Sequence, residues 1–223
     1  MSSAMKVYPI FLNNLAGRKC VVIGGDAEAE RKVAALLDCD ASVTVISPDP
    51  SEALVQLMED SRLIWINRGY RPGDLRGAFL VILGEPHHEN AEAIWRESES
   101  ERALINVMDN ALHCSFVAGS VVRRGRLAIS ISTSGAAPAL AVRLRQRLED
   151  MLDQEYASFL DVMGQLRETM ATRFPDFEER RRRWYALVDS DILSLITAGD
   201  VEKANRRLGE LVGEDLPVRF QLQ

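Results

Sequence analysis

Residues 20–32 read CVVIGGDAEAERK, an apolar run followed by two glycines and a stretch of helix-forming residues. An apolar strand that passes through a glycine turn into a helix is typical of the first unit of a parallel α/β sheet. The backbone N–H groups at the start of such a helix bind anions such as the pyrophosphate of a dinucleotide. The stretch therefore predicts a strand, a phosphate-binding turn and a helix.

Short apolar runs continue to alternate with helical patterns up to about Asp109. This alternation predicts a Rossmann-like, doubly wound parallel sheet with helices on both faces. We expect the domain to span residues 1–113. The expected strands are 19–23, 42–47, 63–67, 79–83 and 104–107, and the expected helices are 29–37 and 90–98.

The pattern changes after Cys114. Residues 116–122 and 127–132 are expected to form a small β-hairpin with one apolar face, for which we expect a second subunit to supply the cover. We therefore expect residues 114–150 to be a hairpin and helix region for dimerisation and substrate binding. Residues 151–223 are expected to be a helical C-terminal region. Helical patterns run over 139–152, 156–170, 177–188 and 200–212.

Composition excludes several classes of protein. The 223 residues include 27 Lys and Arg and 33 Asp and Glu, which gives a formal net charge of −6. A general nucleic-acid-binding protein would instead be basic overall. No apolar run approaches the roughly 18 residues of a membrane helix, and the first residues lack a secretory signal. Three widely spaced cysteines do not form a disulfide framework. We expect a cytoplasmic protein with no nucleic-acid or membrane partner.

The glycine turn departs from the usual dinucleotide pattern at one position. In the spacing G-x-G-x-x-G/A the three positions are Gly24, Asp26 and Ala29, so a carboxylate stands where the backbone approaches the phosphates. Two like charges ~4 Å apart repel by about 4 kcal/mol at an effective dielectric constant of ~20, which would weaken dinucleotide binding unless Arg31 or Lys32 offsets the charge. A turn that only joins a strand to a helix is the alternative interpretation.

Residues 105–149 read INVMDNALHCSFVAGSVVRRGRLAISISTSGAAPALAVRLRQRLE. They contain, in order, an Asn-Val-x-Asp strand end, Cys-x-Phe, a hairpin, a Ser-Thr-rich turn, a proline and an arginine-bearing helix that ends in Glu. With the glycine loop, this order resembles the precorrin-2 dehydrogenase and sirohydrochlorin ferrochelatase family, over about Tyr8 to Glu149. The resemblance implies a homodimer that oxidises precorrin-2 to sirohydrochlorin with NAD during sirohaem biosynthesis.

The resemblance also implies a catalytic carboxylate at Asp109, which follows strand 104–107 at the sheet edge where doubly wound folds bind ligands. Its role would be to accept a substrate proton while the nicotinamide takes a hydride. An Asp-Asn pair also favours turns, so a turn residue is the alternative, and nearby His113 is either an aid to proton transfer or a surface histidine. We expect NAD to be bound by Gly24, Gly25, Asp26, Ala27, Glu28 and Ser47.

Residues 114–150 are rich in basic side chains, because they contain six arginines and only two acidic residues. Because guanidinium groups bind carboxylates, and the family's tetrapyrrole substrates are ringed by carboxylates, this excess suits substrate binding. A solvated helix face is the alternative for Arg143. The expected substrate-binding residues are Arg123, Arg124, Ser132, Thr133 and Arg143.

Three alternatives remain open at the level of function. The same cleft could also insert iron, which would make the protein a bifunctional dehydrogenase and ferrochelatase. The Asp26 change could instead leave a non-catalytic tetrapyrrole-binding protein with a degenerate cofactor loop. The choice between NAD and NADP is not decided. The three histidines show no ligand spacing, so we expect no metal site.

Overall fold

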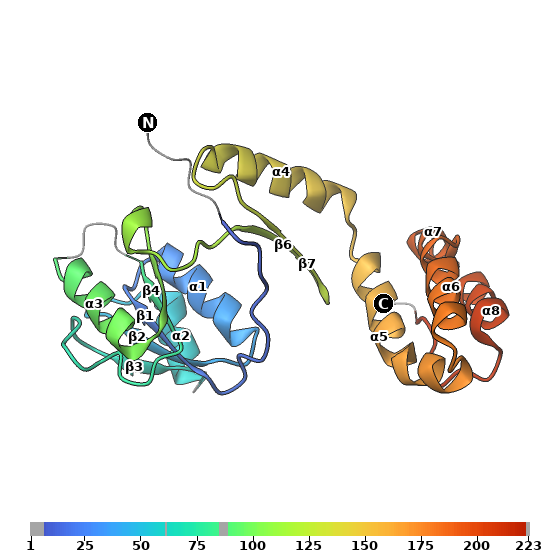
Figure 1. Cartoon of the computed structure of the whole chain (residues 1–223), viewed down its shortest axis with the longest axis horizontal. Helices are drawn as coiled ribbons and strands as arrows, with labels where there is room; N and C mark the ends of the chain where they lie inside the picture. The colour runs from blue at the N-terminus through green and yellow to red at the C-terminus, as the bar shows by residue number, and fades with distance from the viewer. Residues whose placement is uncertain (1–6, 61, 85–88, 222–223) are drawn as a thin grey trace. The chain divides into compact units, whose positions relative to one another are not determined.

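The computed structural model describes residues 7–60, 62–84 and 89–221 (Figure 1). The described residues up to Ala118 form one compact unit, the N-terminal unit, and those from Gly119 onwards form another, the C-terminal unit. Each unit is treated by itself below. The division into three parts at residues 113 and 150 stays a prediction.

The N-terminal unit is built on five parallel strands in the order β3-β2-β1-β4-β5. This is the strand order of the Rossmann fold, in which the ligand crevice lies where the order reverses, here between β1 and β4. The predicted doubly wound sheet is confirmed. The strands are β1 (Lys19–Ile23), β2 (Ser42–Ile46), β3 (Ile64–Ile66), β4 (Leu80–Leu83) and β5 (Leu104–Val107).

Helices cover both faces of this sheet, and each face has its own core. Val22 of β1 packs on one face with Val33 of α1 and Leu54 of α2, while Val21 packs on the other with Ile94 of α3. Strands buried on both faces read as continuous apolar runs, which is why they could be predicted. The helices are α1 (Ala27–Leu37), α2 (Glu52–Glu59) and α3 (Ala91–Glu101), and η1 (Ala111–His113) is a short 3-10 turn.

The hairpin of the C-terminal unit is shorter than predicted. Strands β6 (Ser120–Arg124) and β7 (Leu127–Ile131) pair around a two-residue turn at Gly125 and Arg126. The expected first strand, 116–122, begins too early because Ser115 and Phe116 donate their backbone N–H groups to Ile105 of β5 instead.

The hairpin also finds cover within its own chain. Val122 is fully buried, and it pairs with Ile129, so both lie on the same face as Arg124. The Arg124 guanidinium donates to the carbonyl oxygens of Glu149 and Leu152 at the end of helix α4 (Pro138–Met151), so this face is turned towards α4. Helix α4 therefore covers part of this face, while Leu127, Ile129 and Ile131 stay only half-buried, and cover by a second subunit stays a prediction.

Four further helices complete the C-terminal unit and confirm its helical character, although the short α7 was not predicted. Their shared core contains Leu166, Met170, Leu187, Ile192 and Leu208. In the described part of the chain, no helix is both long enough and apolar enough to cross a membrane. The helices are α5 (Glu155–Arg173), α6 (Phe177–Val188), α7 (Ile192–Thr197) and α8 (Val201–Val212).

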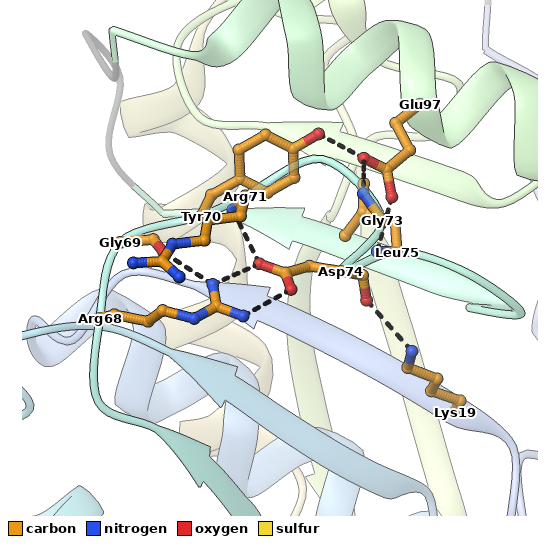
Figure 2. A network of polar contacts seen from close by, with 9 residues as sticks. All are labelled: Lys19, Arg68, Gly69, Tyr70, Arg71, Gly73, Asp74, Leu75 and Glu97. Atoms are coloured by element: carbon orange, nitrogen blue, oxygen red, sulfur yellow. Dashed lines mark hydrogen bonds and ion pairs between the residues drawn. The ribbon is translucent and has the colours of Figure 1, made fainter.

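A polar network fixes the connection between β3 and β4 (Figure 2). The Glu97 carboxylate on α3 accepts hydrogen bonds from the backbone N–H groups of Gly73 and Leu75, at 3.0 and 2.7 Å, and from the Tyr70 hydroxyl. Arg68 binds Asp74 through two hydrogen bonds of 2.7 and 2.8 Å, which holds the pKa of that carboxyl below its usual range. The network sets where the chain enters β4.

Replacing Glu97 with Ala is expected to lower the free energy of unfolding by about 2–4 kcal/mol, because two backbone donors and the largely buried Tyr70 hydroxyl lose a charged acceptor. Urea denaturation measures the loss. Glu99→Ala on the exposed side of the same helix is the control, and we expect it to change stability by less than about 0.5 kcal/mol. Equal losses in the two variants would contradict the role given to Glu97.

Candidate functional site

The loops that carry the predicted chemistry leave the sheet at one edge. A row of backbone hydrogen bonds links the strand ends: Gly24 N to Ile46 O at 3.0 Å, Gly84 N to Ile23 O at 2.9 Å, and Met108 N to Leu83 O at 3.0 Å. Strands β1 and β5 are two strand spacings apart, about 10 Å, and the glycine turn and the Asp109 turn follow them at the same edge of the sheet. We call the glycine turn Gly24–Ala29, Gly84 and the turn Val107–Cys114 the strand-end site.

The two glycines of the turn have different structural roles. Gly24 adopts a φ of 121°, a backbone conformation that side chains disfavour. A Cβ atom on Gly25 would lie 2.4 Å from the Asp49 carbonyl oxygen and 2.5 Å from Ser47 Oγ, and Gly25 O accepts a hydrogen bond from Ser51 N. Gly25 therefore lets the turn close against the loop that follows β2.

Asp26 caps helix α1. Its Oδ1 accepts hydrogen bonds from the backbone N–H groups of Glu28 and Ala29, at 3.1 and 2.9 Å. The sequence left open whether this carboxylate is paired, and the structure shows that the side chain turns back onto its own helix. Arg31 and Lys32 do not offset its charge, since both form ion pairs with Glu28.

The turn retains the donors that a pyrophosphate needs. Among the described residues, the backbone N–H groups of Gly25, Asp26 and Ala27 have no hydrogen-bond partner, whereas those of Glu28 and Ala29 are taken by Asp26. The missing Cβ of Gly84, a position 3.8 Å from Asp26 Oδ1, keeps the end of β4 open beside them. The turn thus fits a dinucleotide pyrophosphate, with fewer donors than an uncapped helix would offer.

The Ser47 hydroxyl, expected at the ribose, lies inside the loop that follows β2. The residue is almost fully buried, and its Oγ accepts a hydrogen bond from Asp49 N at 3.2 Å. Its own proton remains available to an acceptor.

Asp109 is a turn residue, and its catalytic role stays a prediction. It lies in the four-residue turn Val107–Asn110, closed by a hydrogen bond of 3.3 Å from Asn110 N to Val107 O, with a φ of 55°. Its exposed carboxylate has no partner among the described residues. A left-handed residue other than glycine costs about 1–3 kcal/mol and often marks a functional position.

Cys114 holds this turn from one side. Val107 N donates to Cys114 Sγ at 3.1 Å, and the thiol lies 3.3 Å from the Asn110 carbonyl oxygen. Next to it, Ser115 Oγ accepts a hydrogen bond from Ile105 N at 2.7 Å. The Cys-x-Phe motif is therefore the segment that ties the Asp109 turn to β5, a role that the sequence analysis missed.

His113 holds the turn from the other side. Its Nδ1 is 2.9 Å from Asn110 Nδ2, and its Nε2 is 3.1 Å from the Glu92 carboxylate. The ring stacks on Trp95 with the ring centres 4.9 Å apart. The interpretation as a free surface histidine is therefore wrong. The only signal in the sequence was that Glu92 and Trp95 are three residues apart on one helix, and therefore share a face.

The expected substrate-binding residues all belong to the C-terminal unit and fall into two groups. Arg123 and Arg124 lie near the hairpin turn, and Arg124 donates to three backbone carbonyl oxygens, which makes it a clamp on α4. Ser132 and Thr133 follow the opposite end of β7, where their hydroxyl oxygens accept from the backbone N–H groups of Ser134 and Ala137. Arg143, the fifth expected residue, lies on α4 and is exposed.

A groove of about 730 Å³ in the C-terminal unit contains none of the predicted site residues; Arg126, Leu160 and Trp184 are among those that line it. In the described residues, no group of three or more His, Cys, Asp or Glu side chains is placed to hold a metal ion. His87 and His88 lie outside the described residues.

Three family models match the chain in succession. Residues 11–120 match the NAD(P)-binding family, residues 124–151 match the central region of sirohaem biosynthesis proteins, and residues 155–212 match the sirohaem synthase dimerisation region. The similarity therefore extends well beyond Glu149, where the sequence analysis ended it.

Curated relatives and a solved structure agree with these matches. The chain is 32% identical to siroheme synthase of Mannheimia succiniciproducens over 204 residues, which is 92% of this chain and 43% of that protein. It is 32% identical to siroheme synthase 3 of Aeromonas hydrophila over 212 residues, 95% of this chain and 45% of the relative. The chain thus spans less than half the length of these relatives.

The structure of SirC, a precorrin-2 dehydrogenase, superposes with a TM-score of 0.73 at 20% identity and covers 92% of this chain and 98% of SirC. This likeness shows a shared fold. Together with the three successive family matches, it accounts for both units of the molecule. Along successive ranges, the chain is thus similar to an NAD(P)-binding family and to the central and dimerisation regions of sirohaem synthases.

Proposed function

We propose that this protein oxidises precorrin-2 to sirohydrochlorin with NAD, in the cytoplasm, as a step of sirohaem biosynthesis. The observation that carries the proposal is the exposed Asp109 carboxylate, held in a left-handed turn at the same edge of the sheet as a glycine turn with three available N–H groups. The three free cysteines suit a reducing compartment.

The reaction removes a hydride and a proton from the macrocycle. NAD supplies the hydride acceptor when it is bound. The Asp109 carboxylate accepts the proton and returns it to solvent, to which it is exposed. The N–H groups of Gly25, Asp26 and Ala27 bind the pyrophosphate, and Ser47 holds the loop after β2 against the glycine turn.

The C-terminal unit supplies the substrate contacts in this proposal. Arg123 and Arg143 are exposed, so their guanidinium groups can bind the carboxylates of the tetrapyrrole. Ser132 and Thr133 orient it through their hydroxyl protons, and Arg124 fixes the hairpin that carries Arg123.

A direct assay tests the activity. The purified chain is incubated with precorrin-2 and NAD, and the sirohydrochlorin spectrum and NADH are recorded, with NADP in a parallel reaction. We expect one NADH for each sirohydrochlorin. Tight tetrapyrrole binding without any NADH would identify a binding protein, and sirohaem formed from sirohydrochlorin and ferrous iron would add chelation.

The match of residues 155–212 to a dimerisation region supports a homodimer. Light scattering at micromolar concentration measures the mass directly. A mass of one chain would contradict this part of the proposal.

A further inference from the structure

The His113 ring is fixed by two elements that pack on either side of it. On its own turn, Nδ1 contacts Asn110 Nδ2; from α3, Glu92 contacts Nε2 and Trp95 stacks on the ring. Glu92 is itself held by Arg96, whose Nε donates to it at 2.9 Å. With both nitrogens and one ring face occupied, the imidazole has a single orientation.

We propose that His113 is a positioning residue that holds the Asp109 turn through the side chain of Asn110. The inference rests on the proposed function, in which Asp109 accepts the substrate proton. His113 itself touches neither reacting group; it acts through its neighbour.

The direction of the contact with Asn110 follows from donor chemistry. Asn110 Nδ2 is a donor, so Nδ1 of His113 is the acceptor in this contact, and Nε2 lies 3.1 Å from the Glu92 carboxylate. A chain of contacts runs from Arg96 through Glu92 and His113 to Asn110.

Asn110 is the point where this chain reaches the turn. Its backbone N–H closes the turn onto Val107, and its carbonyl oxygen accepts from His113 N and lies near the Cys114 thiol. Its side chain has one contact among the described residues, with His113. Cys114 therefore fixes the main chain after Asp109, and His113 fixes the side chain that flanks it.

Two amide substitutions separate this role from simple packing. In His113→Asn, the shorter side chain can place an acceptor oxygen near the position of Nδ1 but cannot reach Glu92. In His113→Gln, the longer side chain reaches towards Glu92 and gives up the acceptor for Asn110. Asn110→Ala and the double variant Asn110→Ala/His113→Gln complete a double-mutant cycle.

The readouts are kcat and KM for precorrin-2 and the hydrogen exchange of backbone amides 107–114 in the full chain. We expect His113→Gln and Asn110→Ala each to lower kcat about tenfold with KM little changed, and the double variant to lose no more than either. We expect His113→Asn to stay within about threefold of wild type. Exchange should accelerate in the Gln variant and remain slow in the Asn variant.

Equal losses in the Asn and Gln variants, or additive losses in the double variant, would overturn the proposal and leave a packing role on Trp95. A wild-type chain that does not oxidise precorrin-2 would refute the proposed function instead. In that case the exchange rates alone decide: faster exchange in His113→Gln than in His113→Asn supports the positioning role, and equal rates overturn it. Thermal melts confirm that all variants are folded.

Discussion

Asp109→Asn is expected to lower kcat for precorrin-2 oxidation by a factor of about 10²–10⁴, the usual contribution of a positioned proton acceptor. The amide has the shape of the carboxylate but does not accept a proton at neutral pH, and Asn is also tolerated in the left-handed conformation that Asp109 adopts. Steady-state kinetics with saturating NAD measure the loss. NAD affinity, measured by titration calorimetry, should be unchanged.

The chain offers a matched control in Asp40. This exposed aspartate also has a positive φ, 58°, but it lies in the turn between α1 and β2, at the opposite edge of the sheet. Asp40→Asn makes the same chemical change in the same backbone conformation and should leave kcat unaltered. If Asp109→Asn retains near wild-type turnover, Asp109 is only a turn residue.

A second substitution separates catalysis from backbone strain. Asp109→Gly removes the steric cost of the left-handed conformation, so we expect stability to be unchanged or slightly raised while activity is lost. If Asp109 served folding alone, Asp109→Gly would instead lower stability and leave activity unchanged.

The sheet could be predicted because its strands are buried on both faces. Residues 104–107 form a strand with the predicted bounds, since an apolar run ends where a polar turn begins. Helix α2 was missed although its signals are local: Leu54, Leu57 and Met58 have the i, i+3, i+4 spacing of one helix face, and Ser51 caps the helix start. The hairpin boundary was wrong because Ser115 and Phe116 pair with β5, a contact between distant segments.

The choice of Asp109 stays a prediction, and the sequence did not predict how the side chains around it are held. A strand end and a resemblance were enough to choose Asp109. The contacts that hold its turn are between distant residues, because Glu92 and Trp95 of α3 contact His113, about 20 residues away. At Asp26 the missed signal was local: an aspartate directly before a helix is a preferred N-cap residue, and its carboxylate binds the first N–H groups. The sequence analysis considered only its charge.

Asp26→Gly is expected to raise the affinity for NAD by about tenfold or more, equivalent to at least about 1.4 kcal/mol. The substitution removes a negative charge from the phosphate-binding turn and frees the N–H groups of Glu28 and Ala29, which the carboxylate occupies. Stability should fall by only a few tenths of a kcal/mol, because glycine is accepted at the N-cap. Titration calorimetry with NAD measures the first effect, and urea denaturation measures the second.

Two further variants identify the cause of the change. Asp26→Asn keeps an N-cap acceptor without the charge, so an affinity between wild type and Asp26→Gly assigns separate contributions to the charge and to the freed donors. Asp176→Gly removes a similar cap from α6, where Asp176 accepts from Glu179 N at 2.8 Å, and should leave NAD affinity unchanged. Equal or weaker binding in Asp26→Gly would mean that the capped helix, with its three remaining N–H groups, is the form that binds the cofactor.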